Sequence, residues 1–332
     1  MNAKINGQGC RTLAGDALPS RRVLLCSGLA LMLSAPGCKY FQRHVELETP
    51  PPELFQQPPS LPELLGALNA RSDRVLDLQT DMGHVTAPGF PRVPASLRML
   101  RPRHMRLQAN LLTRPVLDLG SNEERFWVWG AGEPVRFARH DQFANSAAAT
   151  LLPVEPTWLM EAMGLIHFDP AGAHQGPFQR EDGNIEVHTI VASSLGQRIR
   201  VVAIHPQYGY ITEVQMRDAR GGLLAIAKAS RHRYFSEQQV TLPRRVSLDL
   251  VASQLPVKSF EFEAESYTVN LLHSVAAHPN LWAMPAGPSV DLAASGLQGV
   301  PLGAARSQPS QPSAQTANAE FHPQYRGYTQ TR

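Results

Sequence analysis

The chain has 332 residues, 18% of them charged and 43% hydrophobic, with a formal net charge of +3. This charge is small for the length, and the basic residues are scattered rather than gathered with aromatic residues on one element, which argues against nucleic-acid binding. Cys10, Cys26 and Cys38 are the three cysteines. Because all of them fall in or at the end of the N-terminal leader described next, the mature domain has no thiol for a disulfide or a nucleophile.

The N-terminus has the pattern of an export signal. Arg21 and Arg22 precede an apolar run over residues 23–35, which is too short to span a bilayer comfortably. Paired arginines fit a twin-arginine signal and an ordinary Sec signal about equally well, so the export route stays open. We therefore expect residues 1–37 to be a signal peptide.

The end of the apolar run resembles a bacterial lipobox, in which a small residue precedes the cysteine that receives the lipid. Gly37 and Cys38 fit this pattern, whereas Ala35 replaces the usual leucine and Pro36 is an unusual neighbour. The main interpretation is a lipoprotein anchored through Cys38. The alternative is a secreted protein that is cleaved nearby.

Two segments with few large apolar residues flank the part of the chain that we expect to fold. Residues 38–60 hold the lipidated cysteine and the proline runs 50–52 and 58–59, which predict a stiff, extended spacer. Residues 285–332 are rich in Gly, Pro, Ser, Gln and Ala, a composition typical of a disordered tail. One domain over 61–284 remains, and it is large enough for a sizeable core.

Most of this domain has the alternating pattern of half-buried strands. A helix over 61–69 comes first, with Ser60 as its N-cap, and a second helix is predicted over 155–164. Strands are predicted over 75–84, 95–100, 104–112, 116–119, 125–129, 135–139, 184–193, 199–203, 210–217, 223–234, 246–250 and 259–269.

The connections between the strands of 196–234 are short, at 205–209 and 218–222. They cannot hold a crossover helix, so neighbouring strands must be antiparallel, as in a meander. The entry to the strand at 246 contains Pro243, which suits an edge position where proline costs no ladder bond. The sequence therefore predicts a curved antiparallel sheet.

Together, the export signal, the leading helix, the long meander with one helical insertion and the Trp-rich strand resemble the LolA/LolB superfamily of bacterial lipoprotein-carrier proteins. The best matching residues are 124–129 (ERFWVW), 211–218 (ITEVQMRD) leading to Gly222, and 242–243 (LP). The resemblance covers residues 61–269. It implies a mainly β (α+β) fold: an open, incomplete barrel formed by a curved antiparallel sheet, with helices covering a cavity for acyl chains.

The resemblance implies the anchored acceptor form if Cys38 is lipidated, and the soluble carrier form if it is not. An acyl-chain cavity needs large apolar and adaptable side chains. Our candidates for its lining are Met105, Leu107, Trp127, Trp129, Trp158, Met160 and Met163. The alternative for each of them is ordinary packing in the core.

Catalysis has little support in the sequence, which contains no G-x-S-x-G elbow, no H-E-x-x-H motif and no glycine-rich phosphate loop. The nearest grouping of candidate ligands is His167, Asp169, Glu181, Asp182 and His188, and it lacks a metal-site spacing. We therefore predict no enzyme activity, no cofactor and no metal.

The predicted function is that of an envelope lipoprotein that binds lipid or the acyl chains of lipoproteins. It would face the periplasm, at the outer membrane, and act in lipoprotein sorting or transfer. Its expected partners are acyl chains, the membrane reached through the N-terminal lipid anchor, and an envelope protein, with no nucleic acid. The alternative is a structural or scaffolding lipoprotein with a packed core and a tail that binds a partner.

Overall fold

The computed structural model describes residues 50–143, 146, 149, 152–193, 196–252, 258–272 and 278–294. The predicted signal peptide, Cys38 and the tail beyond residue 294 lie outside the described residues. What we expect of them therefore stays a prediction.

Fifteen strands of the described residues form one sheet. They are β1 (Asp77–Thr86), β2 (Val93–Leu100), β3 (His104–Leu111), β4 (Arg114–Ser121), β5 (Arg125–Gly130), β6 (Val135–Arg139), β7 (His174–Gln179), β8 (Ile185–Ser193), β9 (Gly196–Ile204), β10 (Ile211–Asp218), β11 (Leu223–Phe235), β12 (Val240–Asp249), β13 (Ser259–Ala264), β14 (Thr268–Val269) and β15 (Ser289–Asp291). Their order across the sheet is β15-β6-β5-β4-β3-β2-β1-β13-β12-β11-β10-β9-β8-β7, with β14 beside β1. The sheet does not close on itself, so the prediction of a mainly β, open antiparallel sheet is confirmed.

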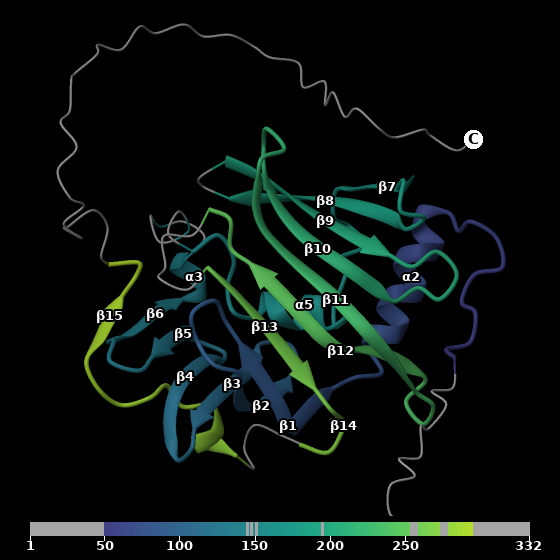
Figure 1. Ribbon diagram of the computed structural model, residues 1–332. Helices are drawn as coiled ribbons and strands as arrows, with labels where there is room; N and C mark the ends of the chain where they lie inside the picture. The colour runs from purple at the N-terminus through teal and green to yellow at the C-terminus, as the bar shows by residue number, and fades with distance from the viewer. Residues whose placement is uncertain are drawn as a thin grey trace, which may run out of the picture. The chain divides into compact units, whose positions relative to one another are not determined.

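Two meanders make up this sheet, and they meet where β1 pairs with β13 (Figure 1). From that join, β1 to β6 run outward to one side, and β7 to β13 return from the other side. At the join Val85 lies opposite Phe262 in antiparallel register. The short connections predicted from the sequence, at 205–209 and 218–222, link antiparallel neighbours as expected.

The helices lie against the sheet rather than within it. The longest, α2 (Leu61–Ser72), begins after Ser60, whose backbone N–H donates to Glu63 Oε2 at 3.4 Å, and it buries Leu64 and Leu68. The short helices α3 (His140–Phe143) and α5 (Trp158–Ala162) lie between the two meanders in the chain, and η1 (Pro279–Trp282) is a 3-10 turn. α5 packs against β10 and β11, and it is seen behind the sheet in Figure 1.

The core lies between one face of the sheet and the helices. Strand residues on this core face include Leu97, Leu107, Val202 and Phe262, all of them buried. They alternate with polar residues on the outer face, as the period of a strand requires.

Several elements of the structure differ from those expected from the sequence. The helix expected over 155–164 is only five residues long, because turns flank it and the chain leaves it through Gly164 at φ +88°. β7 was not predicted, because Gly176 and Pro177 interrupt the alternation of apolar and polar residues. The proline is tolerated because β7 is an end strand that pairs only with β8. β12 begins at Val240 rather than at 246. Its pairing with β13 starts only at Arg245, so no strand pairs with Pro243 on the side where β13 lies.

The folded body extends beyond both boundaries predicted from composition. In the expected spacer, the backbone N–H of Leu54 donates to Gln207 O at 2.8 Å, and Phe55 is buried in the core. In the expected tail, β15 pairs in parallel with β6 and Leu292 is buried. Average composition missed both contacts because each depends on one or two apolar residues within a polar segment.

The imidazole of His232 on β11 makes stability depend on pH. Its Nε2 lies 2.8 Å from Ile211 O and its ring stacks on Tyr210 at 4.1 Å. Burial lowers the pKa of His232 to about 4, helped by nearby His205 and opposed by the hydrogen bond to Ile211.

A folded-state pKa below the unfolded value means that the unfolded chain binds more protons, so stability is full above pH about 6.5 and falls toward pH about 4. We expect His232 to contribute a loss of up to about 3 kcal/mol across this window. Urea unfolding of the wild type and of His232→Gln between pH 7.5 and 4 measures it, and the variant should have the shallower pH dependence. Equal slopes would contradict the assignment.

Candidate functional site

Five of the seven candidate lining residues come together in the core. Met105 and Leu107 lie on the core face of β3, and both are fully buried. Trp158, Met160 and Met163 come from α5 and its C-terminal end and join the same cluster. The side chains of α5 therefore fill the space in front of the sheet.

The other two candidates, Trp127 and Trp129, lie on the outer face of the sheet. In the register of β4 and β5, Trp127 is opposite Gly120 and Trp129 is opposite Asp118, whereas Phe126 next to them belongs to the core cluster. The sequence of β5 is apolar at successive positions, so alternation did not reveal which side chains face inward. Whether any of the seven residues contacts an acyl chain stays a prediction.

Trp127 is held in a buried polar cluster on this outer face. Its Nε1 donates to Asp118 Oδ1 at 2.9 Å, and Arg106 Nη2 and Gln108 Nε2 donate to Asp118 Oδ2 at 2.7 and 2.9 Å. Arg106 Nη1 also donates to Leu281 O at 2.8 Å, so the cluster ties η1 to the sheet. These contacts give Trp127 and Asp118 a structural role.

A segment without strands covers the core face. This covering segment comprises the described residues between 140 and 168, and it contains α3 and α5. Ala149, Leu152, Val154 and Phe168 are among its buried members. Two sets of side-chain contacts fasten it to the rest of the molecule and a third lies within it, and we call the three sets together the latch.

Two arginines of β9 form the first part of the latch. Arg198 donates to Pro153 O at 2.7 Å and to Ala149 O at 3.0 Å, and burial lowers its pKa. Arg200 Nη1 donates to Glu161 Oε1 at 2.8 Å, and its guanidinium lies 5.4 Å from the ring of Phe168. Both arginines therefore face the core side of the sheet.

The second part of the latch joins the covering segment to α2. The side-chain amide of Asn69 donates to Phe168 O, and its oxygen accepts from Phe168 N, both at 2.8 Å. The third part is internal: His140 Nδ1 lies 2.8 Å from Glu155 Oε2. Burial by itself would lower the pKa of His140, but the hydrogen bond and charge of Glu155 outweigh burial and raise it.

Three buried polar atoms of α5 and of Arg200 on β9 have no hydrogen-bond partner among the described residues. They are Trp158 Nε1, Glu161 Oε2 and Arg200 Nε. Unpaired polar atoms in a buried place weaken the closed arrangement, because each costs desolvation without compensation. Sequence reasoning missed Arg198 and Arg200 as site residues. The available signal was that these arginines occupy alternate positions at the start of a strand whose later residues, 201–204, are all apolar.

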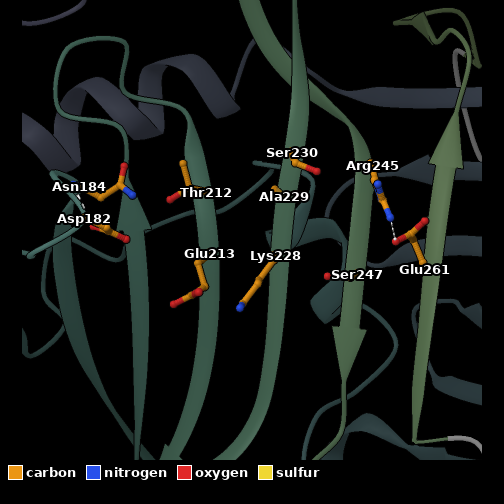
Figure 2. Close-up of a pocket in the computed structure, with 10 residues that line it drawn as sticks. All are labelled: Asp182, Asn184, Thr212, Glu213, Lys228, Ala229, Ser230, Arg245, Ser247 and Glu261. Carbon is orange, nitrogen blue, oxygen red and sulfur yellow. Dashed lines mark hydrogen bonds and ion pairs between the residues drawn. The ribbon is translucent and has the colours of Figure 1, made fainter.

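One hollow lies on the outer face of the second meander, not against the core. It measures about 400 Å³, and Figure 2 shows its lining of Asp182, Asn184, Thr212, Glu213, Lys228, Ala229, Ser230, Arg245, Ser247 and Glu261. Arg245 and Glu261 pair within it at 2.6 Å. Because both signs of charge are mixed and no aromatic ring lines it, it does not favour one class of ligand.

The described residues contain no group of three or more His, Cys, Asp or Glu side chains placed to hold a metal ion. His188 Nε2 instead lies 2.6 Å from Glu186 Oε1, and Asp182 pairs with Arg180 at 3.2 Å. Among the described helices, none is long and apolar enough to cross a membrane.

The site is thus an open antiparallel sheet whose apolar face is closed by a latched, irregular segment. No protein-family model and no curated protein matches the chain. Several solved structures are similar to it, three of which follow. The first is a domain described as an outer membrane lipoprotein-sorting protein domain, from Vibrio parahaemolyticus, with 10% identity, 67% of this chain and 97% of that chain covered, and a TM-score of 0.45.

A LolA superfamily protein from Nitrosomonas europaea is 9% identical, with 66% of this chain and 97% of that chain covered and a TM-score of 0.38. The lipoprotein LppX from Mycobacterium tuberculosis is 11% identical, with 64% and 100% covered and a TM-score of 0.22. A member of the superfamily that the sequence resembles is therefore among the similar structures.

The packing of Trp127 on Gly120 gives a prediction. A Cβ atom on Gly120 would lie 2.0 Å from the indole, whereas one on Gly130 would meet only Val116 O at 4.0 Å. We expect Gly120→Ala to lower the free energy of unfolding by about 1–3 kcal/mol and Gly130→Ala to change it by less than about 0.5 kcal/mol. Urea unfolding of the two variants measures the difference, and equal values would show that Trp127 does not lie where the structure places it.

Proposed function

We propose that this protein is a non-catalytic envelope lipoprotein that binds lipid, or the acyl chains of lipoproteins, between the core face of the sheet and the covering segment. One observation carries the proposal: the apolar face of a large open sheet is closed by an irregular segment, not by a second sheet. Side-chain packing and the latch hold this cover, together with His140, whose backbone N–H donates to Glu124 O at 3.2 Å and whose Nε2 lies 2.9 Å from Asn122 O.

The core face has room where α5 lies. Ala225, Ala227 and Ala229 occupy successive core-face positions of β11, and α5 packs against this strand. These small side chains take up little volume in front of the sheet, and we call this stretch the trough. Met160 of α5 and Met163 at its C-terminal end belong to the same core cluster. An acyl chain is as apolar as these side chains and can replace their contacts if α5 moves away.

The latch allows such a movement at a modest free-energy cost. The contacts of Arg198, Arg200 and Asn69 with the covering segment are side-chain hydrogen bonds, so no ladder of the sheet breaks when they open. Each of these bonds contributes a net free energy of about 0.5–3 kcal/mol, and the burial of a bound acyl chain can offset its loss.

The proposed location rests on the sequence. A signal peptide over 1–37 and lipidation of Cys38 would place the domain in the cell envelope, facing the periplasm at the outer membrane. Binding of lipoprotein acyl chains there would serve lipoprotein sorting or transfer.

The scaffolding alternative also has an observation in its favour. Six of the seven candidate lining residues are buried by the protein itself, Trp129 being the half-buried one. A core that is packed permanently would need no ligand. The two functions therefore differ in whether the covering segment opens.

Native mass spectrometry with lipid extraction, on the mature chain purified without detergent, tests the proposal. We expect a co-purifying acyl-chain ligand at a defined stoichiometry, because an opened core face would otherwise be exposed to water. Ala227→Leu should reduce occupancy by filling the trough, whereas Ser230→Leu on the outer face is the matched control. A protein that stays free of ligand after incubation with phospholipid and lipopeptide would favour the scaffold.

The latch gives a second prediction. Arg200→Gln removes the ion pair with Glu161, so the covering segment should open more often. Loss of a hydrogen bond between charged groups predicts amide hydrogen exchange about tenfold faster over residues 152–168. Arg217→Gln is the control, since Arg217 bonds Gln215 Oε1 at 2.7 Å on the outer face. Unchanged exchange in Arg200→Gln would mean that the pair does not hold the segment closed.

A further inference from the structure

A second, smaller hollow lies at one end of the core. It measures about 30 Å³ and is bounded by the C-terminal turn of α2, by residues 164–166 after α5, by the entry to β10 at 209–211 and by the start of β12 at 240–242. A water-sized group needs about 10–15 Å³, so the hollow has room for about two such groups.

Two hydroxyl groups line this hollow and lack a partner. Ser72 Oγ and Thr241 Oγ1 are both buried and form no hydrogen bond, and Ser72 is only 3% exposed. A buried hydroxyl without a partner is costly, so the pair indicates that something polar belongs between them.

The guanidinium of Arg71 lines the same hollow. It donates to Tyr208 O, and among the described residues it forms no ion pair. The nearby carboxylate of Asp73 is directed elsewhere, to Arg101 at 3.2 Å and His167 at 3.8 Å. Burial lowers the pKa of Arg71, and the charge of Arg74 adds to this effect. A partly buried cation without a carboxylate needs a counter-ion.

Tyr210 also lines the hollow, and most of its other walls are apolar. Leu68, Val75, Leu165 and Leu242 line it, and all four belong to the core cluster. One guanidinium and two hydroxyls suit an oxyanion, while the walls suit the first carbons of a hydrocarbon chain. The docked residues 54 and 55 pack beside Gly209, so the hollow lies where the chain arrives from the predicted anchor.

We propose that this hollow binds the anionic head group of an amphiphile, a carboxylate or a phosphate, with two of its oxygens held by Arg71, Ser72 and Thr241. The hydroxyls and the guanidinium donate, and the oxyanion accepts. This inference rests on the proposed function, because it places the head group of the acyl-chain ligand at this end of the core.

Binding of four probes to the mature chain tests this site: oleate, phosphatidic acid, neutral diacylglycerol and inorganic phosphate alone. We expect Arg71→Gln to weaken binding of the two anionic amphiphiles about tenfold to a hundredfold and to leave diacylglycerol unchanged. Arg74→Gln is the matched control, because Arg74 lies one turn away and bonds the exposed Gln239. It should change binding less than about threefold.

A second variant covers the case in which Arg71→Gln fails to fold. Thr241→Val keeps the shape of the side chain and removes the hydroxyl. It should weaken the binding of the anionic probes about fivefold and leave the binding of the neutral probe unchanged. Preference for oleate or for phosphatidic acid tells a carboxylate from a phosphate head group. Phosphate binding that depends on Arg71, with no lipid bound, would support the oxyanion site while the proposed function fails.

Two results would overturn the inference. One is that Arg71→Gln weakens the binding of neutral and anionic amphiphiles equally, which would mean that Arg71 supports the fold rather than binds a head group. The other is anion affinity that stays at the wild-type value in both variants, with ordered water alone between Ser72 and Thr241. Lipid binding that persists in that case leaves the proposed function intact.

Discussion

The structure depends on one constraint: an open sheet with one apolar face must have that face covered. The sheet does not close, since its order ends at β15 on one side and at β7 on the other. The join of β1 with β13 brings the two meanders into one surface, and the chain between β6 and β7 supplies the cover. The connection between the two halves of the sheet is therefore also the lid of the core, so fold and site come from the same piece of chain.

The position of charges follows from this arrangement. Arg198 and Arg200 face the core side because the cover leaves backbone carbonyls and Glu161 there for them to bond. A hydrogen bond inside an apolar cluster favours one packing arrangement over the others that apolar side chains alone would allow. On the outer face a polar cluster attaches the turn η1 to the sheet: Asp118 accepts hydrogen bonds from Arg106 and Trp127, and Arg106 donates to Leu281 O in η1. Buried charge thus fixes the cover on one face and the C-terminal segment on the other.

Strand alternation was enough to predict most of the sheet, because it reports burial on one face directly. β6 was expected over 135–139 and lies at Val135–Arg139, and α2 could be placed from Ser60 and Glu63. The site was harder to predict. Trp127 and Trp129 share a face in the sequence, but only the register with Gly120 and Asp118 shows that it is the outer one. The pairing of Arg200 with Glu161 joins residues of distant elements, which no local pattern contains.

The parallel pairing of β15 with β6 has a consequence for the solubility of the folded domain. A final antiparallel strand leaves a row of free backbone groups, which is a template for another chain and a cause of aggregation. β15 occupies this row over Ser289 to Asp291, and the N–H of Leu292 donates to Phe137 O at 2.8 Å just beyond it. β15 itself is only three residues long, so the edge that it presents at this end of the sheet is short. The ten residues from 285 to 294, which composition assigns to a tail, thereby act as a built-in protection against self-association.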